Sequence, residues 1–130
     1  MGTLGYSAHS VLIVEDEPLV RLVAASIVED EGFVVREAAN AAEAIYFLEK
    51  YADISLVFTD VNMPGSMDGL ALARHIRARW PRIEVIVTSG LAQVSAEELP
   101  TNSLFVKKPY RAEQITGAIH RMLGRPSAAA

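Results

Sequence analysis

Residues 55–64 read SLVFTDVNMP, and they are the most informative stretch of the chain for its architecture. The run at 55–59 is largely apolar, with β-branched and aromatic side chains, and it leads directly into Asp60. Short runs of this kind, without regular polar alternation, are typical of a strand buried on both faces of a parallel sheet. Met63-Pro64-Gly65 then forces a loop. The stretch therefore predicts a buried parallel strand that ends at a carboxylate.

Four more short apolar runs flank this stretch, at 11–14, 33–35, 84–88 and 103–106. They are also rich in Val, Ile and Phe, and they predict four further strands of the same buried kind.

The segments between these runs have the spacing of amphipathic helices. In the first of them, Leu19, Val23 and Ile27 recur at intervals of four residues. Asn40, followed three residues later by Glu43, indicates a capping-box start for the second helix. The segment at 92–99 holds few apolar residues and is the weakest of the predicted helices.

Five alternations of strand and helix predict an α/β fold of the (βα)5 type, a three-layer sandwich around a five-stranded parallel sheet. We expect one domain at 10–124, with flexible tails at 1–9 and 125–130.

Composition narrows the class of protein. The chain has 130 residues, 51% of them hydrophobic, which is typical of a folded domain and excludes a disordered chain. A net charge of -4 argues against a nucleic-acid-binding protein, because such domains carry a basic face. The absence of cysteine excludes disulfides, thiolate metal sites and cysteine nucleophiles. Neither a membrane span nor a signal peptide is recognisable, so we expect a protein of the cytoplasm.

Polar side chains follow four of the five predicted strands, as Glu15-Asp16-Glu17, Asp60, Thr88-Ser89-Gly90 and Lys107-Lys108-Pro109. The carboxyl ends of parallel strands meet at one edge of a sheet, so these groups are expected to converge there. Crowded carboxylates raise one another's pKa or recruit a cation, and their oxygens suit Mg2+. A carboxylate in such a place can also act as a nucleophile, as in aspartyl-phosphate chemistry.

The acids of this group are expected to differ in role. Asp60 is the candidate nucleophile, and Glu15 and Asp16 are candidate cation ligands. Glu17 directly precedes Pro18, and we interpret it as a solvated acid at the start of a helix.

The bases and hydroxyls differ as well. Lys108 is expected to face the acids, whereas Lys107 points to the opposite face because side chains alternate along a strand. The Thr88 hydroxyl either joins the site or satisfies the end of its own strand.

Taken together, these residues resemble the receiver (phosphoacceptor) domain of two-component response regulators. The resemblance covers about residues 10–123 and rests on Glu15-Asp16, 60–64 (DVNMP), Asp68-Gly69, Thr88-Ser89 and 108–110 (KPY). It implies a flavodoxin-like fold with strand order 2-1-3-4-5. It also implies a function in a phosphorelay, in which Mg2+-dependent phosphoryl transfer onto Asp60 switches a protein-binding surface. Such a domain is not an enzyme but a phosphoacceptor that assists its own phosphorylation and dephosphorylation.

The resemblance further implies a role for each matching acid. Asp60 would accept the phosphoryl group from a histidine kinase or histidine phosphotransfer protein. Asp16 would bind Mg2+ directly, Glu15 would be its partner, and Asn62 would add its backbone carbonyl.

It implies roles at the other strand ends too. Lys108 would pair with the phosphoryl oxygens, and Thr88 would be the switch hydroxyl that turns toward the phosphate. Phe105 would be the aromatic switch, for which a plain core position is the alternative. Ser89 and Pro109 are supporting residues.

The chain departs from the commonest pattern of that family in three places. The loop at 64–69 is one residue longer, Phe105 lacks the hydroxyl of a tyrosine, and the helix at 92–99 is short. The last departure leaves the downstream protein partner unknown. No direct contact with nucleic acid or membrane is expected, a homodimer remains open, and the chain is interpreted as a stand-alone receiver or one cut from a longer protein.

Three alternatives stay open. An aspartate-nucleophile phosphohydrolase would need a second acid two residues after the nucleophile, where this chain has Asn62. A nucleotide- or flavin-binding module would need a phosphate-cradling loop after the first strand, where Glu15-Asp16-Glu17 would repel phosphates. A degenerate receiver would act only as a docking domain, without phosphorylation.

Overall fold

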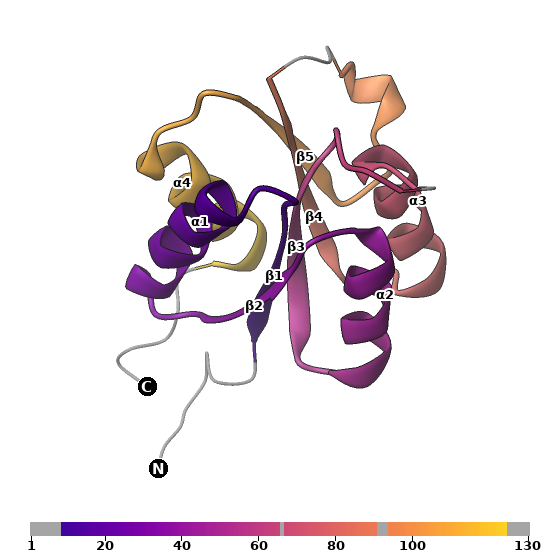
Figure 1. Cartoon of the computed structure of the whole chain (residues 1–130), viewed down its shortest axis with the longest axis horizontal. Coiled ribbons are helices and arrows are strands. Elements are labelled where there is room, and N and C mark those ends of the chain that lie inside the picture. Colours follow the sequence, from indigo (N-terminus) through magenta and orange to yellow (C-terminus); the bar gives the residue numbers. More distant parts are fainter. Residues whose placement is uncertain (1–8, 66, 91–93, 125–130) are drawn as a thin grey trace.

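The computed structural model describes residues 9–65, 67–90 and 94–124. Within them the chain alternates strands and helices as β1 (Ser10–Val14), α1 (Pro18–Asp30), β2 (Val34–Ala38), α2 (Ala41–Lys50), β3 (Ile54–Asp60), α3 (Gly69–Arg79), β4 (Glu84–Ser89), β5 (Ser103–Lys107) and α4 (Ala112–Leu123). The strands form one parallel sheet in the order β2-β1-β3-β4-β5, as predicted (Figure 1). Apart from His9, the predicted tails lie outside the described residues.

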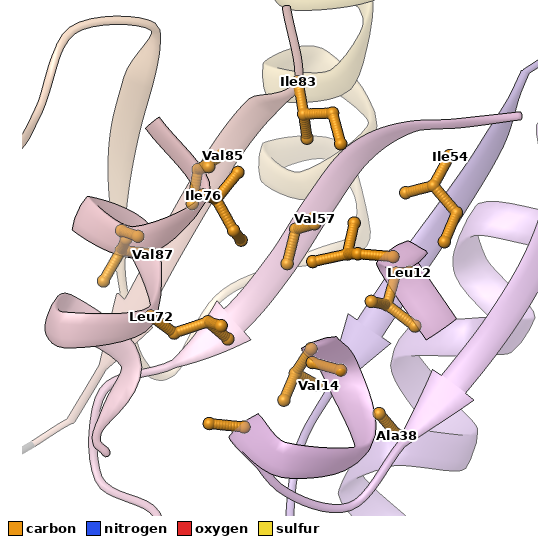
Figure 2. Packing of buried hydrophobic residues seen from close by; sticks show 14 of the residues in the cluster. Leu12, Val14, Ala38, Ile54, Val57, Leu72, Ile76, Ile83, Val85 and Val87 are labelled. Carbon is orange, nitrogen blue, oxygen red and sulfur yellow. The ribbon is translucent and has the colours of Figure 1, made fainter. Parts of the chain in front are cut away.

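Two layers of helices cover the sheet, α1 and α4 on one face and α2 and α3 on the other (Figure 1). Alternation along the strands supplies both cores. On β1, for example, Leu12 and Val14 belong to the α2–α3 side, whereas Val11 and Ile13 belong to the α1–α4 side. Figure 2 shows Leu12 and other buried residues of the α2–α3 side packed together.

The predicted helix at 92–99 is wrong in type. Its described part contains only a 3-10 turn, η2 (Ala96–Glu98), while residues 91–93 lie outside the described residues. The Glu98 amide donates to the Ser95 carbonyl at 3.0 Å, a three-residue spacing that does not propagate as an α-helix. Pro100 follows at once and has no amide hydrogen with which to extend it. The described residues therefore contain four α-helices rather than five.

The predicted burial of the outer strands is also wrong in part. β2 and β5 form the two edges of the sheet, and their side chains are mostly half-buried or exposed. The three inner strands have nearly all of their residues buried, as the apolar runs predict. The sequence of a short run does not indicate its position in the sheet, and an edge position leaves a strand less covered.

The starts of α2 and α3 fix the loops beside the carboxyl edge. Asn40 accepts the Glu43 amide at 2.8 Å, as the capping pattern predicts, although the Glu43 carboxylate accepts the Ala39 amide instead of the Asn40 amide. Asp68 caps α3 by accepting the Ala71 amide at 2.9 Å.

Gly69, the first residue of α3, lies directly against the end of β3. A Cβ atom at this position would lie 2.7 Å from the carbonyl carbon of Asp60, so only glycine fits without moving backbone. The Gly69 amide also donates to the Val61 carbonyl at 2.9 Å. The helix start and the end of β3 are therefore held together.

Candidate functional site

Asp60 ends the central strand β3 at the carboxyl edge of the sheet. Its carboxylate is almost fully buried, with the residue 7% exposed. The backbone pairs in register with Thr88 on β4, and the Val61 amide donates to the Thr88 carbonyl at 2.9 Å. The nucleophile candidate is thus placed by sheet register rather than by a mobile loop.

Three carboxylates gather at this edge. One oxygen each from Glu15, Asp16 and Asp60 lies within 4.8 Å of the others. Glu15 and Asp60 are buried, and Asp16 is the least buried of the three. The set consists only of oxygen donors, which is the chemistry that a hard divalent cation such as Mg2+ requires.

Lys108 lies between two of these acids. Its ammonium Nζ is 3.2 Å from Glu15 Oε1 and 3.5 Å from Asp60 Oδ2. The backbone amide of Lys108 donates to the Ser89 carbonyl at 3.0 Å, which aligns the end of β5 with the end of β4. Lys107 is exposed. The two lysines therefore differ as strand alternation predicts.

The charges of this site are unbalanced. Burial raises the pKa of the Asp60 carboxyl, and Lys108 only partly opposes the shift. Burial also raises the pKa of Glu15, against a hydrogen bond from the Glu17 amide and the charge of Lys108. Burial lowers the pKa of Lys108, but Asp60 and Glu15 outweigh burial and the net shift is upward. One ammonium thus faces two carboxylates whose ionisation burial opposes, so an added divalent cation would relieve the site.

Thr88 and Ser89 end β4 next to Asp60. The Thr88 hydroxyl is buried and has no hydrogen-bond partner among the described residues. A buried hydroxyl without a partner is unusual in folded proteins and leaves a donor for an incoming oxygen. The Ser89 hydroxyl donates to Asn62 Oδ1 at 3.1 Å and so joins the end of β4 to the loop after Asp60.

The other residues that the sequence analysis singled out differ in their burial and in their contacts at the carboxyl edge of the sheet. The backbone amide of Asn62 partly opposes the effect of burial on the pKa of Asp60, while the predicted role of the Asn62 backbone carbonyl stays a prediction. Phe105 on β5 is half-buried against the α2–α3 core, and Glu17 is exposed. Pro109 lines a cleft of about 540 Å³ beside Lys108. Ser66, in the loop at 64–69, lies outside the described residues.

Leu19, Val20 and Val23 of α1 line the other side of this cleft, on an exposed apolar face of the helix. Leu19, Leu22 and Val23 are 76%, 55% and 57% exposed. The buried residues of α1 are instead Ala24, Ala25 and Val28. The row of Leu19, Val23 and Ile27 correctly predicted a helix, but two of its members point to solvent. The sequence of α1 contains two rows of apolar residues, one with Leu19 and Val23 and one with Ala24 and Val28, and the presence of two rows indicates that one apolar face is exposed.

Arg21 also lies beside the site, and the sequence analysis did not identify it as a site residue. Its Nη1 donates to the Glu15 carbonyl at 2.8 Å, and its Nε donates to Glu37 on β2 at 3.2 Å. No motif marks a contact between an arginine and a backbone carbonyl.

Comparison with known proteins identifies related chains. A sequence model described as "Response regulator receiver domain" matches residues 11–120. The chemotaxis protein CheY of Bacillus subtilis is 34% identical over 89% of this chain and 98% of its own length. The sensor kinase CckA of Brucella abortus is 36% identical over 88% of this chain, which spans only 12% of that kinase. The chain spans about a quarter of two other relatives named as NtrX-like or NtrX regulators.

Solved structures agree with the fold. A response regulator receiver protein from Sinorhizobium medicae superposes with a TM-score of 0.82 at 29% identity, over 88% of this chain and 94% of that one. The receiver domain of NtrX from Brucella abortus superposes with a TM-score of 0.79 at 34% identity, over 88% of this chain and 98% of that one. Among the described residues, no helix is both long and apolar enough to cross a bilayer.

Proposed function

The chain belongs to the receiver domain family of two-component response regulators, and from this we propose that Asp60 accepts a phosphoryl group from a phosphohistidine donor. The observation that carries the proposal is the position of Lys108. Its ammonium pairs with both the buried Asp60 carboxylate and the Glu15 carboxylate. A carboxylate nucleophile, the Lys108 ammonium and further acidic side chains therefore lie together at one edge of the sheet. The donor would be a histidine kinase or a histidine phosphotransfer protein.

The proposed step is a single displacement at phosphorus. One Asp60 carboxylate oxygen attacks the phosphorus atom, and a P–O bond forms while the P–N bond to the donor imidazole breaks. The imidazole leaves with the electron pair of that bond and takes up a proton. The product is an acyl phosphate on Asp60. With acetyl phosphate as donor, a P–O bond breaks instead and acetate leaves.

Glu15, Asp16 and Asp60 fit a divalent cation, because their oxygens are close together and their negative charge exceeds that of the one neighbouring ammonium. These three residues, with the backbone carbonyl of Asn62, would hold Mg2+. When bound, the ion supplies charge neutralisation for the acids and for the phosphoryl oxygens.

The chain's own groups supply the remaining stabilisation. The Lys108 ammonium would move from the carboxylates toward the phosphoryl oxygens, which carry the charge of the transition state. The partnerless Thr88 hydroxyl would donate to one of these oxygens. Its movement would free space next to β5, where Phe105 is half-buried, and so alter the surface that a downstream protein recognises.

In this scheme the protein is a phosphoacceptor that assists its own phosphorylation and dephosphorylation, and it turns over no separate substrate. The proposed donors draw phosphate from ATP, so the proposal places the protein in the cytoplasm. The downstream partner is a protein that distinguishes the two forms of the β4–β5 edge.

Intact-protein mass spectrometry after incubation with acetyl phosphate and Mg2+ tests this proposal. We expect a single phosphoryl adduct that requires Mg2+ and is lost in Asp60→Asn. Asp68→Asn is a matched control, because Asp68 lies on the same loop and Asn caps a helix equally well. This control should keep the adduct.

Beryllofluoride, which mimics a phosphoryl group, covers the case of rapid dephosphorylation. If no adduct is seen, binding of beryllofluoride with Mg2+ would support a short-lived acyl phosphate. Absence of both adduct and binding would contradict the proposal and favour a docking domain. An adduct that persists in Asp60→Asn would contradict the choice of residue.

A further inference from the structure

Arg21 on α1 joins three elements next to the acidic site. Its Nη1 donates to the backbone carbonyl of Glu15 at the end of β1, at 2.8 Å. Its Nε donates to the Glu37 carboxylate on the edge strand β2, at 3.2 Å. The side chain of Arg21 is 20% exposed, and its contact with the Glu15 carbonyl is partly buried. The contact with Glu37 lies at the surface. Within the part of the chain that the structure describes, the Arg21 guanidinium forms its ion pair with Glu37 and none with the three acidic side chains of the site.

The loop from Glu15 to Glu17 is held by the hydrogen bonds of its backbone. The Glu15 amide donates to the Ala38 carbonyl at 3.0 Å, and the Glu17 amide donates to Glu15 Oε2 at 3.2 Å. The Arg21 guanidinium holds the Glu15 carbonyl, which belongs to the peptide group that joins Glu15 to Asp16. Because a peptide group is planar, fixing its carbonyl also fixes the direction in which the chain enters Asp16.

The chemistry of the arginine side chain suits this task. A guanidinium presents several N–H donors in a rigid plane, so one side chain can bond a carbonyl and a carboxylate at the same time. A lysine at this position would keep the charge, but its compact ammonium on a flexible stem lacks that geometry.

We propose that Arg21 is a positioning residue for the divalent cation: anchored on Glu37, its guanidinium holds the Glu15 carbonyl and so orients Asp16 toward the acidic site. The inference rests on the proposed function, because it takes Glu15, Asp16 and Asp60 as the cation ligands. Groups that orient metal ligands affect affinity by about 10- to 100-fold when they are removed. Arg21 acts on the ligand through the backbone and not through its own charge.

An effect of the Arg21 charge and an effect of positioning predict opposite changes in Mg2+ affinity when Arg21 is replaced, so the inference can be tested. A cation near a metal site repels the metal ion, so loss of the Arg21 charge alone would tighten Mg2+ binding. Loss of positioning would weaken it. A role limited to joining α1 with β2 would lower the stability of the fold and leave the Mg2+ affinity of the folded protein unchanged.

The experiment is calorimetric titration of the full chain with Mg2+ alone, for the wild type, Arg21→Gln and Arg21→Lys. Urea unfolding of each variant in EDTA identifies the conditions in which it is folded. We expect both variants to bind Mg2+ about ten-fold more weakly than the wild type. Arg79→Gln is the matched control, because Arg79 on α3 also pairs with one carboxylate, Glu49 at 3.2 Å, and should leave the affinity unchanged.

Each other outcome overturns the inference in an identifiable way. Affinities within two-fold of the wild type in both variants would show a role in folding only, and tighter binding in Arg21→Gln would show an effect of charge. If Arg21→Gln does not fold, Arg21→Lys decides by the same criteria. A wild type that binds no Mg2+ would overturn the metal role in the proposed function, together with this inference.

Discussion

At the scale of single residues, the main feature is an acid that the fold does not neutralise. Asp60 is buried and shares one ammonium with Glu15, so its charged form is disfavoured in the folded protein. For the proposed roles of nucleophile and cation ligand, however, Asp60 must be ionised. The site therefore favours function over stability, a compromise that is common where catalytic or binding groups are buried.

Asp60→Asn is accordingly expected to stabilise the protein in the absence of Mg2+. A carboxyl with a raised pKa opposes folding at pH values above that raised pKa, where the folded state holds the charge. Removing the charge should therefore raise the free energy of unfolding at neutral pH. The gain should shrink as the pH falls through the raised pKa and vanish below the ordinary value of 3.8, where both states are protonated.

Urea unfolding in EDTA, at neutral pH and below 3.8, measures this difference. Asp68→Asn serves as the control, because Asp68 is exposed and should show no gain. A loss of stability at neutral pH in Asp60→Asn would contradict the prediction, since it would mean that the pair with Lys108 outweighs burial.

The same scale shows which site residues a sequence can reveal. Asp60 and Lys108 are recognisable because each follows an apolar run, and the local sequence alone indicates where a buried strand ends. Strand alternation also separates Lys108 from Lys107. Arg21 could not be found in this way, because its partners are a backbone carbonyl and an acid 16 residues away on an edge strand. Such a contact exists only after three elements have packed.

At the scale of elements, α1 shows why helical spacing does not identify the buried face. Leucine and valine look alike in a sequence whether they pack inside or lie at a surface. The face of α1 that packs on the sheet uses Ala24 and Ala25, whose small side chains allow a close approach. The larger Leu19, Leu22 and Val23 stay exposed, and Leu19 and Val23 line the cleft at Lys108. Because exposed apolar patches often mark protein-binding sites, we expect the proposed phosphoryl donor to contact this patch.

Val23→Asp should therefore slow phosphoryl transfer from a phosphorylated histidine phosphotransfer protein about ten-fold or more, while leaving phosphorylation by acetyl phosphate unchanged. A charge on this face opposes docking of an apolar partner surface but does not reach the chemistry. Val34→Asp, at an exposed valine of β2, is the matched control. Stopped-flow or gel-based transfer assays compare the rates. Equal slowing with both donors would place the effect on the acid site instead.

The short η2 turn is the element that the sequence predicted least well. The inner strands and four helices follow from local patterns that packing reinforces. The segment at 92–99 has few apolar positions, so nothing in its own residues drives it onto the sheet. The alternation of strands and helices therefore predicted a helix here that the described residues do not form.

At the scale of the whole molecule, two apolar cores hold the sheet from both sides while the acids lie at one edge. The order of the five strands was available only through resemblance, because periodicity gives no information on which strands are neighbours. The register of the strands then brings the site residues level with one another, since Asp60 pairs with Thr88 and Ser89 pairs with Lys107. Every strand end therefore depends on the folding of the entire sheet.

Mg2+ should consequently stabilise the whole fold. A ligand that binds only the folded state at 100 times its Kd adds about 2.7 kcal/mol to the free energy of unfolding. The expected result is a higher urea midpoint with MgCl2 than with NaCl of the same ionic strength, and a smaller difference in Asp60→Asn. An identical midpoint in both salts would contradict a Mg2+ site at this edge.

Gly69 gives the arrangement an evolutionary consequence. Its hydrogen atoms are all that separates the first turn of α3 from the backbone of Asp60. A saturation mutagenesis screen would therefore score position 69 among the least tolerant in the chain, although it contacts no ligand and carries no chemistry. Intolerance to mutation at position 69 would reflect the lack of space for a Cβ atom. A list of reactive residues derived only from such a screen would therefore wrongly include Gly69.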